Sequence, residues 1–351
     1  MKNLTLLLLT FLISIWSFGQ KASKEDLFST HEPLSLKLDF SFKKLKDDTN
    51  DSTYLDKVLY FKSGDDPWDS IEVRLRRRGH FRLEKCYFPP VKVRIKKKKR
   101  KGTIFEDHKN LKLVIPCERS KDADALVVRE YLCYQIYEHI TPYSFRTRLT
   151  PIELIDHAKK KDRRYKLQAF LIEDDKRVAK RNDAEIRDDV VTHPLRLHDT
   201  TAVRHAMFQY LIANMDWSAT YQHNEKIMRT ENPGRNIPLA YDFDQAGFVN
   251  ATYAVLNPEF ERATVNPDLV RDDVRDRVYR GFCRNNDELM HHVRSEFLDL
   301  EGKIFEIIED HKGYMEERDL KSLNRFIKKF YTTLKDDKLF KYHILSQCRK
   351  E

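Results

Sequence analysis

The chain has 351 residues, of which 40% are hydrophobic and 34% are charged. This composition is typical of a globular protein and excludes an intrinsically disordered chain, which would be depleted in apolar residues. A chain of this length can bury a sizeable core, as one large domain or as two coupled ones. Only nine glycines occur, and no Gly/Ser-rich or Pro-rich linker is present, so we expect lobes that pack together.

The first twenty residues have the pattern of a signal peptide. One lysine precedes an apolar run from Leu4 to Trp16, which is too short to span a bilayer comfortably. Small residues at Ser17 and Gly19 precede a polar stretch, and no cysteine is placed there to accept a lipid. We therefore expect an exported protein (periplasm, cell surface or secreted) with no transmembrane span in the mature chain. An uncleaved interfacial anchor or a buried helix is the alternative interpretation.

The five cysteines are odd in number, widely spaced and without a CxxC pair: Cys86, Cys117, Cys133, Cys283 and Cys348. This pattern argues against a disulfide scaffold and against a zinc site. Cys133 lies between Leu132 and Tyr134 in an expected helix, where a small buried hydrophobic residue is the favoured role. The spacing leaves room for one disulfide and does not identify its pair.

The formal net charge of +9 is concentrated in one part of the chain. Residues 72–101 contain fourteen Lys and Arg but only two Glu. Such a patch fits polyphosphate, nucleic acid or an anionic envelope surface. The run from Lys96 to Lys101 is followed by Gly102 and is better explained as the solvated tip of a hairpin.

The first half of the chain is predicted to be rich in strands. Apolar and polar residues alternate with a period of two, which is typical of half-buried antiparallel strands, in residues 34–42, 71–75, 91–95 and 110–115. Residues 124–139 then change to helical spacing. Two further strands are expected around 148–155 and 165–173, with the charged residues 156–164 as a hairpin loop between them.

From about residue 200 the pattern becomes helical. Thr200 or Thr201 can cap a helix that continues to Met215. A loop-rich interval follows, and residues 269–347 have the spacing of four or five helices. We therefore expect an α+β fold in which a sheet-rich N-terminal lobe packs on a helical C-terminal lobe. The expected parts are a signal peptide at 1–20, the N-terminal lobe at 21–190 and the C-terminal lobe at 191–351.

The side chains best suited to catalysis or metal binding lie in loops beside two short strand-like segments, 225–228 and 237–240. They are Asp216, Asn224, Asp242 and Asp244. Carboxylate and amide oxygens are the ligands that Mg²⁺ prefers, and phosphoryl transfer needs a further Asp to orient the attacking hydroxyl. A hairpin can bring these loops to one end of a sheet. An isolated Asp-x-Asp is more often a turn or a helix cap.

In this interpretation Asp216 is the base or positioning residue, and Asn224 and Asp242 are metal ligands. Asp244 points the same way as Asp242 if the dipeptide is extended, because side chains in a strand repeat every two residues. It would then be a second ligand or a partner that supports the ligands.

Two strings of residues carry a family resemblance. FQYLIANMDW at 208–217 and PLAYDFDQAG at 238–247, with Asn224 between them, resemble the CotH (spore coat protein H-like) family of atypical kinases. Upstream, Arg78-Gly79-His80 resembles the family's Arg-Gly-Asn turn, and residues 90–95 resemble its following basic strand. Residues 110–129 resemble its strand and helix, and residues 167–173 its strand that ends in Glu. The resemblance spans about residues 74–248.

The resemblance implies a kinase-like fold with ATP and Mg²⁺ (or Mn²⁺) as cofactors. It implies Asp216 as the catalytic residue, Asn224 and Asp242 as metal ligands, and Glu173 as the acidic partner of a cation that binds the nucleotide. Lys92, Arg94 and Arg78 are the candidates for that cation. The chain departs from the family pattern at Tyr241, where the family has Trp, and at His80, where it has Asn. No Gly-rich phosphate loop is visible.

These observations favour an exported CotH-like protein kinase that transfers phosphate from ATP to Ser or Thr hydroxyls of secreted or envelope proteins. The alternative is a catalytically inactive envelope or assembly module that binds an anionic partner through its basic face. Direct binding of nucleic acid rests only on the charge of residues 74–101 and is the least favoured interpretation.

Overall fold

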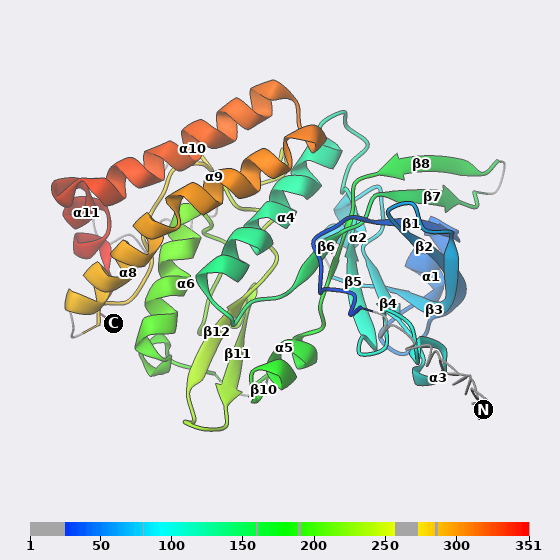
Figure 1. The fold of residues 1–351 in the computed structure, drawn as a ribbon, viewed down its shortest axis with the longest axis horizontal. Helices are drawn as coiled ribbons and strands as arrows, with labels where there is room; N and C mark the ends of the chain where they lie inside the picture. Colours follow the sequence, from blue (N-terminus) through cyan, green and yellow to red (C-terminus); the bar gives the residue numbers. More distant parts are fainter. Residues whose placement is uncertain are drawn as a thin grey trace, which may run out of the picture.

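The structure is a computed structural model that describes residues 25–79, 81–158, 161–188, 191–256, 273–284 and 287–350. The expected signal peptide lies outside these residues. Within the described ranges, every helix is too short or too polar to cross a membrane. The molecule has a strand-rich end and a helix-rich end (Figure 1). The expected α+β fold, with a sheet-bearing N-terminal part packed on a helical C-terminal part, is confirmed.

Among the described residues, the N-terminal part contains one mixed nine-stranded sheet with the order β6-β9-β5-β4-β3-β2-β1-β7-β8. All neighbours are antiparallel except β1 and β7, which are parallel. The strands are β1 (Leu34–Phe40), β2 (Leu55–Ser63), β3 (Asp69–Arg77), β4 (Val91–Arg94), β5 (Asn110–Val114), β6 (Thr147–Leu149), β7 (Ile152–Asp156), β8 (Arg163–Leu167) and β9 (Phe170–Ile172). Three short helices accompany them, namely α1 (Phe42–Asp48), α2 (Phe81–Lys85) and α3 (Lys97–Arg100).

The alternation seen in the sequence determines which face of the sheet is buried. On β3, for example, Ile71, Val73 and Leu75 are buried in the core of the sheet, whereas Arg74 and Arg76 lie on the opposite face. We call this opposite face of β3, β4 and β5 the outer face. The expected strands at 34–42, 71–75, 91–95 and 110–115 are confirmed as β1, β3, β4 and β5.

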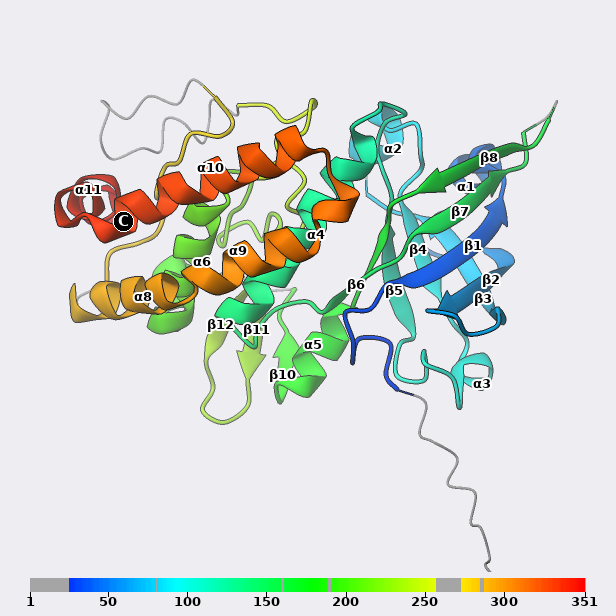
Figure 2. The same cartoon turned by 45° about the horizontal axis from the view of Figure 1, so that its top comes forward.

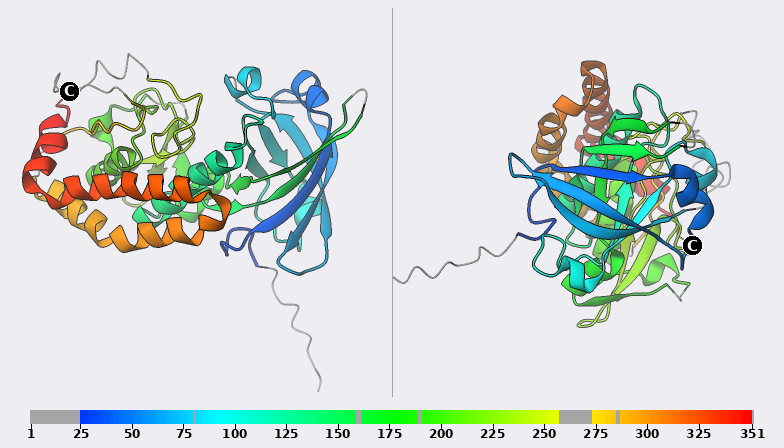
Figure 3. Two further views of the ribbon diagram at one scale, coloured as in Figure 1. Left: turned by 90° about the horizontal axis from the view of Figure 1, so that it is seen from above. Right: turned by 90° about the vertical axis from the view of Figure 1, so that its right-hand side faces the viewer.

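The two strands expected at 148–155 and 165–173 are each divided in two, because one long hairpin bends in its middle. Its first half pairs β6 with β9 at one end of the strand order, and its second half pairs β7 with β8 at the other end. The bend comes at Thr150 and Pro151, where the Thr150 amide still donates to the Ala169 carbonyl at 2.7 Å. Since one hairpin serves both ends of the sheet, the sheet curls on itself (Figure 3).

The C-terminal part is built on helices and a small antiparallel sheet. The sheet has the order β10-β11-β12, with β10 (Ala184–Ile186), β11 (Glu225–Thr230) and β12 (Asn236–Ala240). The helices are α4 (Ala123–Ile140), α5 (Asp175–Arg181), α6 (Asp199–Leu211), α8 (Asp287–Asp299), α9 (Glu301–Asp310), α10 (Glu317–Lys335) and α11 (Asp337–His343), with 3-10 turns η1 (Pro194–Arg196), η2 (Lys312–Tyr314) and η3 (Leu345–Gln347). Helices α8 and α9 follow each other end to end, and α10 lies alongside both (Figure 2).

Helix α4 is the centre of this second part. It was expected at 124–139, and nearly all of its residues from Ala123 to Tyr137 are buried. Its apolar side chains join α6, β11, β12 and the C-terminal helices in one core, although α4 precedes residue 190 in the chain. The hydrophobic effect therefore assembles the helical part around a helix from the first half of the sequence.

Helix α6 differs from its expected bounds at both ends. It begins at Asp199 with His198 as its N-cap, and it ends at Leu211 rather than at Met215. The hydroxyl of Thr201 donates to the carbonyl of His198, so Thr201 lies in the first turn. The helix cannot continue to Met215 because Ala213 has a positive φ of 51°. The residues that follow are thereby released into a loop.

The expectation of at most one disulfide was wrong. The structure contains two, Cys86–Cys117 and Cys283–Cys348, while Cys133 is a buried free thiol. The first joins the end of α2 to the segment after β5, and the second joins residues 283 and 348, which are 65 positions apart. Sequence spacing could not pair these cysteines, because their proximity depends on the packing of distant segments.

Thiol titration tests this arrangement. Denatured but unreduced protein should expose one reactive thiol, from Cys133, and reduction should expose five. The double substitution Cys283→Ser with Cys348→Ser should lower the free energy of unfolding by about 2–5 kcal/mol in urea, because the unfolded chain gains freedom. Three or more thiols before reduction would contradict the pairing.

Candidate active site

The end of the β11–β12 hairpin assembles the residues that the sequence singled out. In the antiparallel register Glu225 lies opposite Ala240, and the Tyr241 amide donates to the Asn224 carbonyl at 3.1 Å. Asn224 and the residue after Tyr241, Asp242, therefore leave the hairpin at the same end. The amide nitrogen of Asn224 donates to the Asp216 carboxylate at 2.8 Å and to the Asp216 carbonyl at 2.9 Å. The structure thus joins Asn224 to Asp216 and places Asp242 at the same end of the hairpin.

The backbone at this point adopts conformations that non-glycine residues rarely take. Positive φ angles occur at Ala213 (51°), Gln222 (48°), Asn224 (50°) and Asp242 (63°). Each such residue costs of order 1 kcal/mol and persists only where the surrounding structure imposes it. Such residues cluster at functional sites, so the backbone independently points to the same loops.

His223 is a neighbour of Asp216 that the sequence analysis did not weigh. Its Nε2 lies 2.8 Å from Asp216 Oδ1, while the other oxygen of the carboxylate accepts from Asn224. A backbone pairing between Ser218 and His223 folds the intervening loop back onto itself. Residues seven apart in the chain thus meet at one carboxylate, a contact that requires knowledge of the loop.

A buried polar network in and next to helix α6 supports the loop that carries Asp216. The side-chain oxygen of Asn214 accepts from the Asp216 amide at 3.0 Å, and its amide nitrogen donates to Gln209 Oε1 at 2.9 Å. Gln209 in turn contacts the ring of His205 at 3.1 Å. Arg280 donates to the carbonyls of Met215 and Trp217 on the other side of the loop. The loop is therefore held by helix α6 and by residue 280.

Glu225 lies beside this network, next to the ring of His205. Their side chains are 0% and 2% exposed, and Glu225 Oε2 lies 3.6 Å from His205 Nε2. Burial raises the pKa of Glu225 to about 8 and lowers the pKa of His205 to about 3. Both groups are therefore neutral at pH 7, because the interior disfavours the charged form of each. His205 is therefore a buried histidine with a structural role.

The expected parallel orientation of Asp242 and Asp244 is wrong. The dipeptide is not extended, because Asp242 has φ of 63°. Asp244 is buried, accepts a hydrogen bond from the Tyr253 hydroxyl at 3.2 Å and lines a small cavity with Glu118 and Glu130. Within the described part of the chain, no group of three or more His, Cys, Asp or Glu side chains is placed to hold a metal ion.

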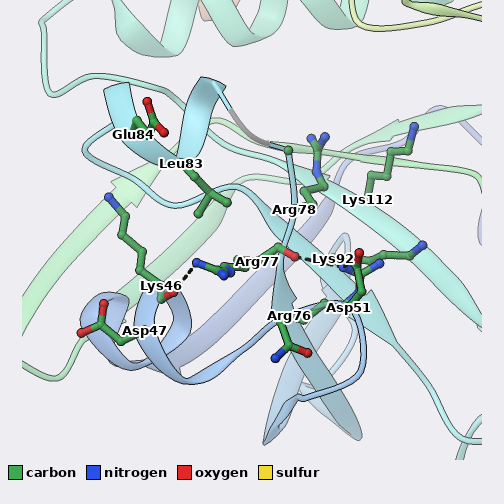
Figure 4. Close-up of a pocket in the computed structure, with 12 residues that line it drawn as sticks. Lys46, Asp47, Asp51, Arg76, Arg77, Arg78, Leu83, Glu84, Lys92 and Lys112 are labelled. Atoms are coloured by element: carbon green, nitrogen blue, oxygen red, sulfur yellow. Dashed lines mark hydrogen bonds and ion pairs between the residues drawn. The ribbon is translucent and has the colours of Figure 1, made fainter. Parts of the chain in front are cut away.

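A large cavity lies on the outer face of the N-terminal sheet, with Lys112 at one edge (Figure 4). Its volume is about 580 Å³, and six of its twelve lining residues are basic. The lining residues are Lys46, Asp47, Asn50, Asp51, Arg76, Arg77, Arg78, Gly79, Leu83, Glu84, Lys92 and Lys112. Helices α1 and α2 border one side, and Lys112 lies on the other. The cavity has the charge and size for a phosphorylated small molecule.

Lys112 on β5 is the functional candidate that sequence reasoning missed. Its ammonium group lies 4.3 Å from the ring centre of Tyr241. Burial and the charge of Arg78 together lower its pKa to about 8, although the carboxylates of Asp242 and Asp175 act in the opposite direction. Lys112 thus borders both the cavity and the Asp242 loop. The sequence did contain a hint of this role, since Lys112 is the charged residue in the middle of a predicted strand.

The cations proposed from the sequence lie near Lys112 in different ways. Lys92 is the direct cross-strand neighbour of Lys112, and Arg78 acts on its charge. Arg94 lies one row further along the sheet, opposite Asn110. Glu173 contacts none of these candidates in its hydrogen bonds and ion pairs. It is 1% exposed and pairs with Arg181 at 3.3 Å.

Comparisons with known proteins add little to this geometry. No protein-family model and no curated protein matches the chain. Among solved structures, the crystal structure of a proinflammatory kinase CtkA of Helicobacter pylori is similar, with 11% sequence identity and a TM-score of 0.37. The match covers 87% of this chain and 98% of that one. A superposition of this quality assigns neither fold nor function.

Substitution of Asn214 by Ala tests the support of the loop. The change leaves the Asp216 amide and Gln209 without their partner, so we expect the free energy of unfolding to fall by about 1–3 kcal/mol. Chemical denaturation measures this. The control is Asn324→Ala on α10, whose half-buried side-chain oxygen accepts no hydrogen bond. Equal losses in the two variants would show that the network does not stabilise the loop.

Proposed function

We propose that this protein is an exported, kinase-like phosphotransferase that moves phosphate from ATP to Ser or Thr hydroxyls of secreted or envelope proteins. One observation carries the proposal: Lys112 lines a basic cavity and also contacts Tyr241, at the hairpin end that carries Asp216, Asn224 and Asp242. Phosphoryl transfer depends on positioning and charge stabilisation by such a set of groups. The resemblance to the CotH family supports the same reaction.

The donor atoms at the hairpin end fit a hard divalent cation. Asn224 turns its amide nitrogen to Asp216, so its amide oxygen is the atom left to bind a metal. That oxygen and the Asp242 carboxylate are ligands that Mg²⁺ or Mn²⁺ accepts together with phosphate oxygens and water. When bound, the metal would neutralise charge on the phosphates.

The remaining roles fall to side chains around this point. Lys112, with Lys92 and Arg78, would hold the phosphates of the nucleotide in the basic cavity. Asp216 would orient the acceptor hydroxyl, and His223 holds one oxygen of its carboxylate in place. Residue Asp244 is buried and would support the loop instead of binding the metal directly.

The two disulfides support the export part of the proposal. Structural disulfides form and persist in oxidising compartments and are rare in the cytosol. Cys86–Cys117 and Cys283–Cys348 therefore agree with the signal-peptide pattern at 1–20.

A second candidate function is supported by the hydrogen bonds that Asp216 already makes within the protein. Both carboxylate oxygens already contact His223 and Asn224, which is the arrangement of a structural residue as well as of a catalytic one. The protein would then be an inactive envelope or assembly module that binds an anionic partner. The test is complementation of a strain that lacks this gene. If the double variant Asp216→Ala with Asp242→Ala restores the wild-type phenotype fully, that result would favour this alternative.

Two single variants distinguish the proposed metal-binding role of Asp242 from the proposed catalytic role of Asp216. Mg²⁺ with ATP should raise the melting temperature of the wild type by several degrees, because ligand binding stabilises the folded state. Asp242→Ala should abolish this shift. Asp216→Ala should keep the shift but lose phosphate transfer by about 100-fold or more. Wild-type protein that shows no shift with ATP and either Mg²⁺ or Mn²⁺ would refute the proposed function.

The pKa of Lys112 predicts how anion binding depends on pH. Below about pH 8 the side chain is charged, and above it the charge is lost. The affinity for inorganic pyrophosphate should therefore fall between pH 7 and pH 9. Lys112→Arg should retain affinity across this range, because a guanidinium stays protonated. Isothermal titration calorimetry at several pH values measures both proteins, and an unchanged wild-type affinity at pH 9 would exclude Lys112 from the site.

The same pKa predicts an effect on stability. The folded-state value of about 8 lies below the ordinary 10.5, so keeping Lys112 charged destabilises the folded state below about pH 8. That penalty disappears as the pH rises toward the ordinary value. Lys112→Met should therefore raise the melting temperature at pH 7 and have less effect at pH 10. A lower melting temperature at pH 7 would contradict the assigned burial penalty.

A further inference from the structure

The outer face of the sheet gathers three guanidinium groups around one aromatic ring. The guanidinium carbons of Arg74, Arg94 and Arg76 lie 4.6, 5.6 and 5.9 Å from the ring centre of Tyr54. The sheet register explains this, because Arg74 is opposite Arg94 and Arg76 follows two positions along β3 on the same face. We call these four residues the arginine cluster. Stacking on the ring holds the planar groups in fixed directions.

The positive charge of the cluster is only weakly compensated. Arg76 pairs with Asp51 and Arg74 lies 3.6 Å from Asp56, and these carboxylates are 95% and 79% exposed. Ion pairs with such exposed partners contribute little, because water competes for both charges. Arg94 contacts the Tyr54 hydroxyl at 3.5 Å.

The pKa of Tyr54 reflects the positive charge of these arginines. Burial by itself would raise its pKa, but the hydrogen bond from Arg94 and the charge of Arg76 bring the pKa below its ordinary value. The cluster is therefore a region of positive potential that attracts an anion.

The cluster is continuous with the proposed active site. Arg76 lies opposite Lys92, and Lys92 lies opposite Lys112, so one row of cations crosses β3, β4 and β5. Two strand spacings separate its ends, about 10 Å. At the far end Lys112 borders the Asp242 loop. An anionic chain bound at the cluster would therefore approach the site at which phosphate is transferred.

We propose that the arginine cluster binds an acidic segment of the acceptor protein and thereby selects which proteins are phosphorylated. The inference rests on the proposed function and adds the substrate class to it. Guanidinium groups bind carboxylates through two parallel hydrogen bonds, which favours Asp and Glu side chains. The exposed carboxylates of Asp51, Asp56 and Glu72 interrupt the surface. They would repel the evenly charged backbone of a nucleic acid, whereas a peptide can place its acids between them.

Direct binding tests the inference without nucleotide or metal. A fluorescein-labelled 12-residue peptide of alternating Glu and Ser should bind the wild-type protein, and a Gln/Ser peptide should not. The variant Arg74→Glu should weaken binding about tenfold or more in fluorescence anisotropy, which corresponds to about 1.4 kcal/mol or more. The matched charge-reversal control is Lys329→Glu on the exposed side of α10. It should bind like the wild type.

The same variants separate this inference from the proposed function. In a phosphorylation assay the arginine variant should raise KM for an acidic acceptor about tenfold, with kcat and the melting shift by Mg²⁺ and ATP unchanged. A retained shift also shows that the variant is folded. If it unfolds, Arg74→Gln, which removes the charge without reversing it, should give a smaller loss in the same direction.

Two results would overturn the inference. One is equal binding of the acidic peptide by the wild type and the folded arginine variant. The other is tighter binding of a single-stranded oligonucleotide of equal charge, which would assign the surface to nucleic acid. Failure of the protein to bind Mg²⁺ and ATP would refute the proposed function and leave the peptide result standing.

Discussion

The pairing of β11 with β12 is the constraint on which the candidate site depends. The antiparallel ladder ends where the Tyr241 amide meets the Asn224 carbonyl, and it thereby starts two loops at one place. Asn224 then holds Asp216, and Asp242 follows directly on the other strand. A slip of one residue in this register would turn each side chain to the opposite face of the sheet. The site therefore exists only in the observed register.

The helical core maintains the strained loops around this hairpin end. Four non-glycine residues with positive φ would not hold their conformations in an isolated peptide. Here the loop carrying Asp216 lies on a buried network that includes Asn214 and His205 from or next to α6. Burial makes these polar contacts costly to break, since an unpaired group in the interior loses its solvation. Local strain and distant packing are thus parts of one arrangement.

The outer face of the N-terminal sheet carries positive charge, opposite in sign to the carboxylates at the hairpin end. Like charges on neighbouring strands destabilise a sheet, yet Arg76, Lys92 and Lys112 occupy directly adjacent positions. Aromatic rings offset part of this cost, since Tyr54 lies beneath the arginines and Tyr241 lies beside Lys112. A surface that keeps such a row of cations is suited to bind an anion, and its two ends suit two anions of different kinds. In the functions we propose, the Lys112 end would hold the phosphates of a nucleotide and the Tyr54 end would hold carboxylates.

Local sequence patterns determined much of the secondary structure of this protein. Alternation with a period of two was enough to locate β1, β3, β4 and β5, because each strand buries one face. The loop residues Asp216, Asn224 and Asp242 could also be singled out from their types and positions. Tertiary structure alone decided the partner of Glu173, the two disulfides, the burial of Asp244 and the setting of Lys112. The physical reason is range: strand and helix patterns reflect neighbours in the chain, whereas pairing, burial and pKa depend on residues that folding brings from elsewhere.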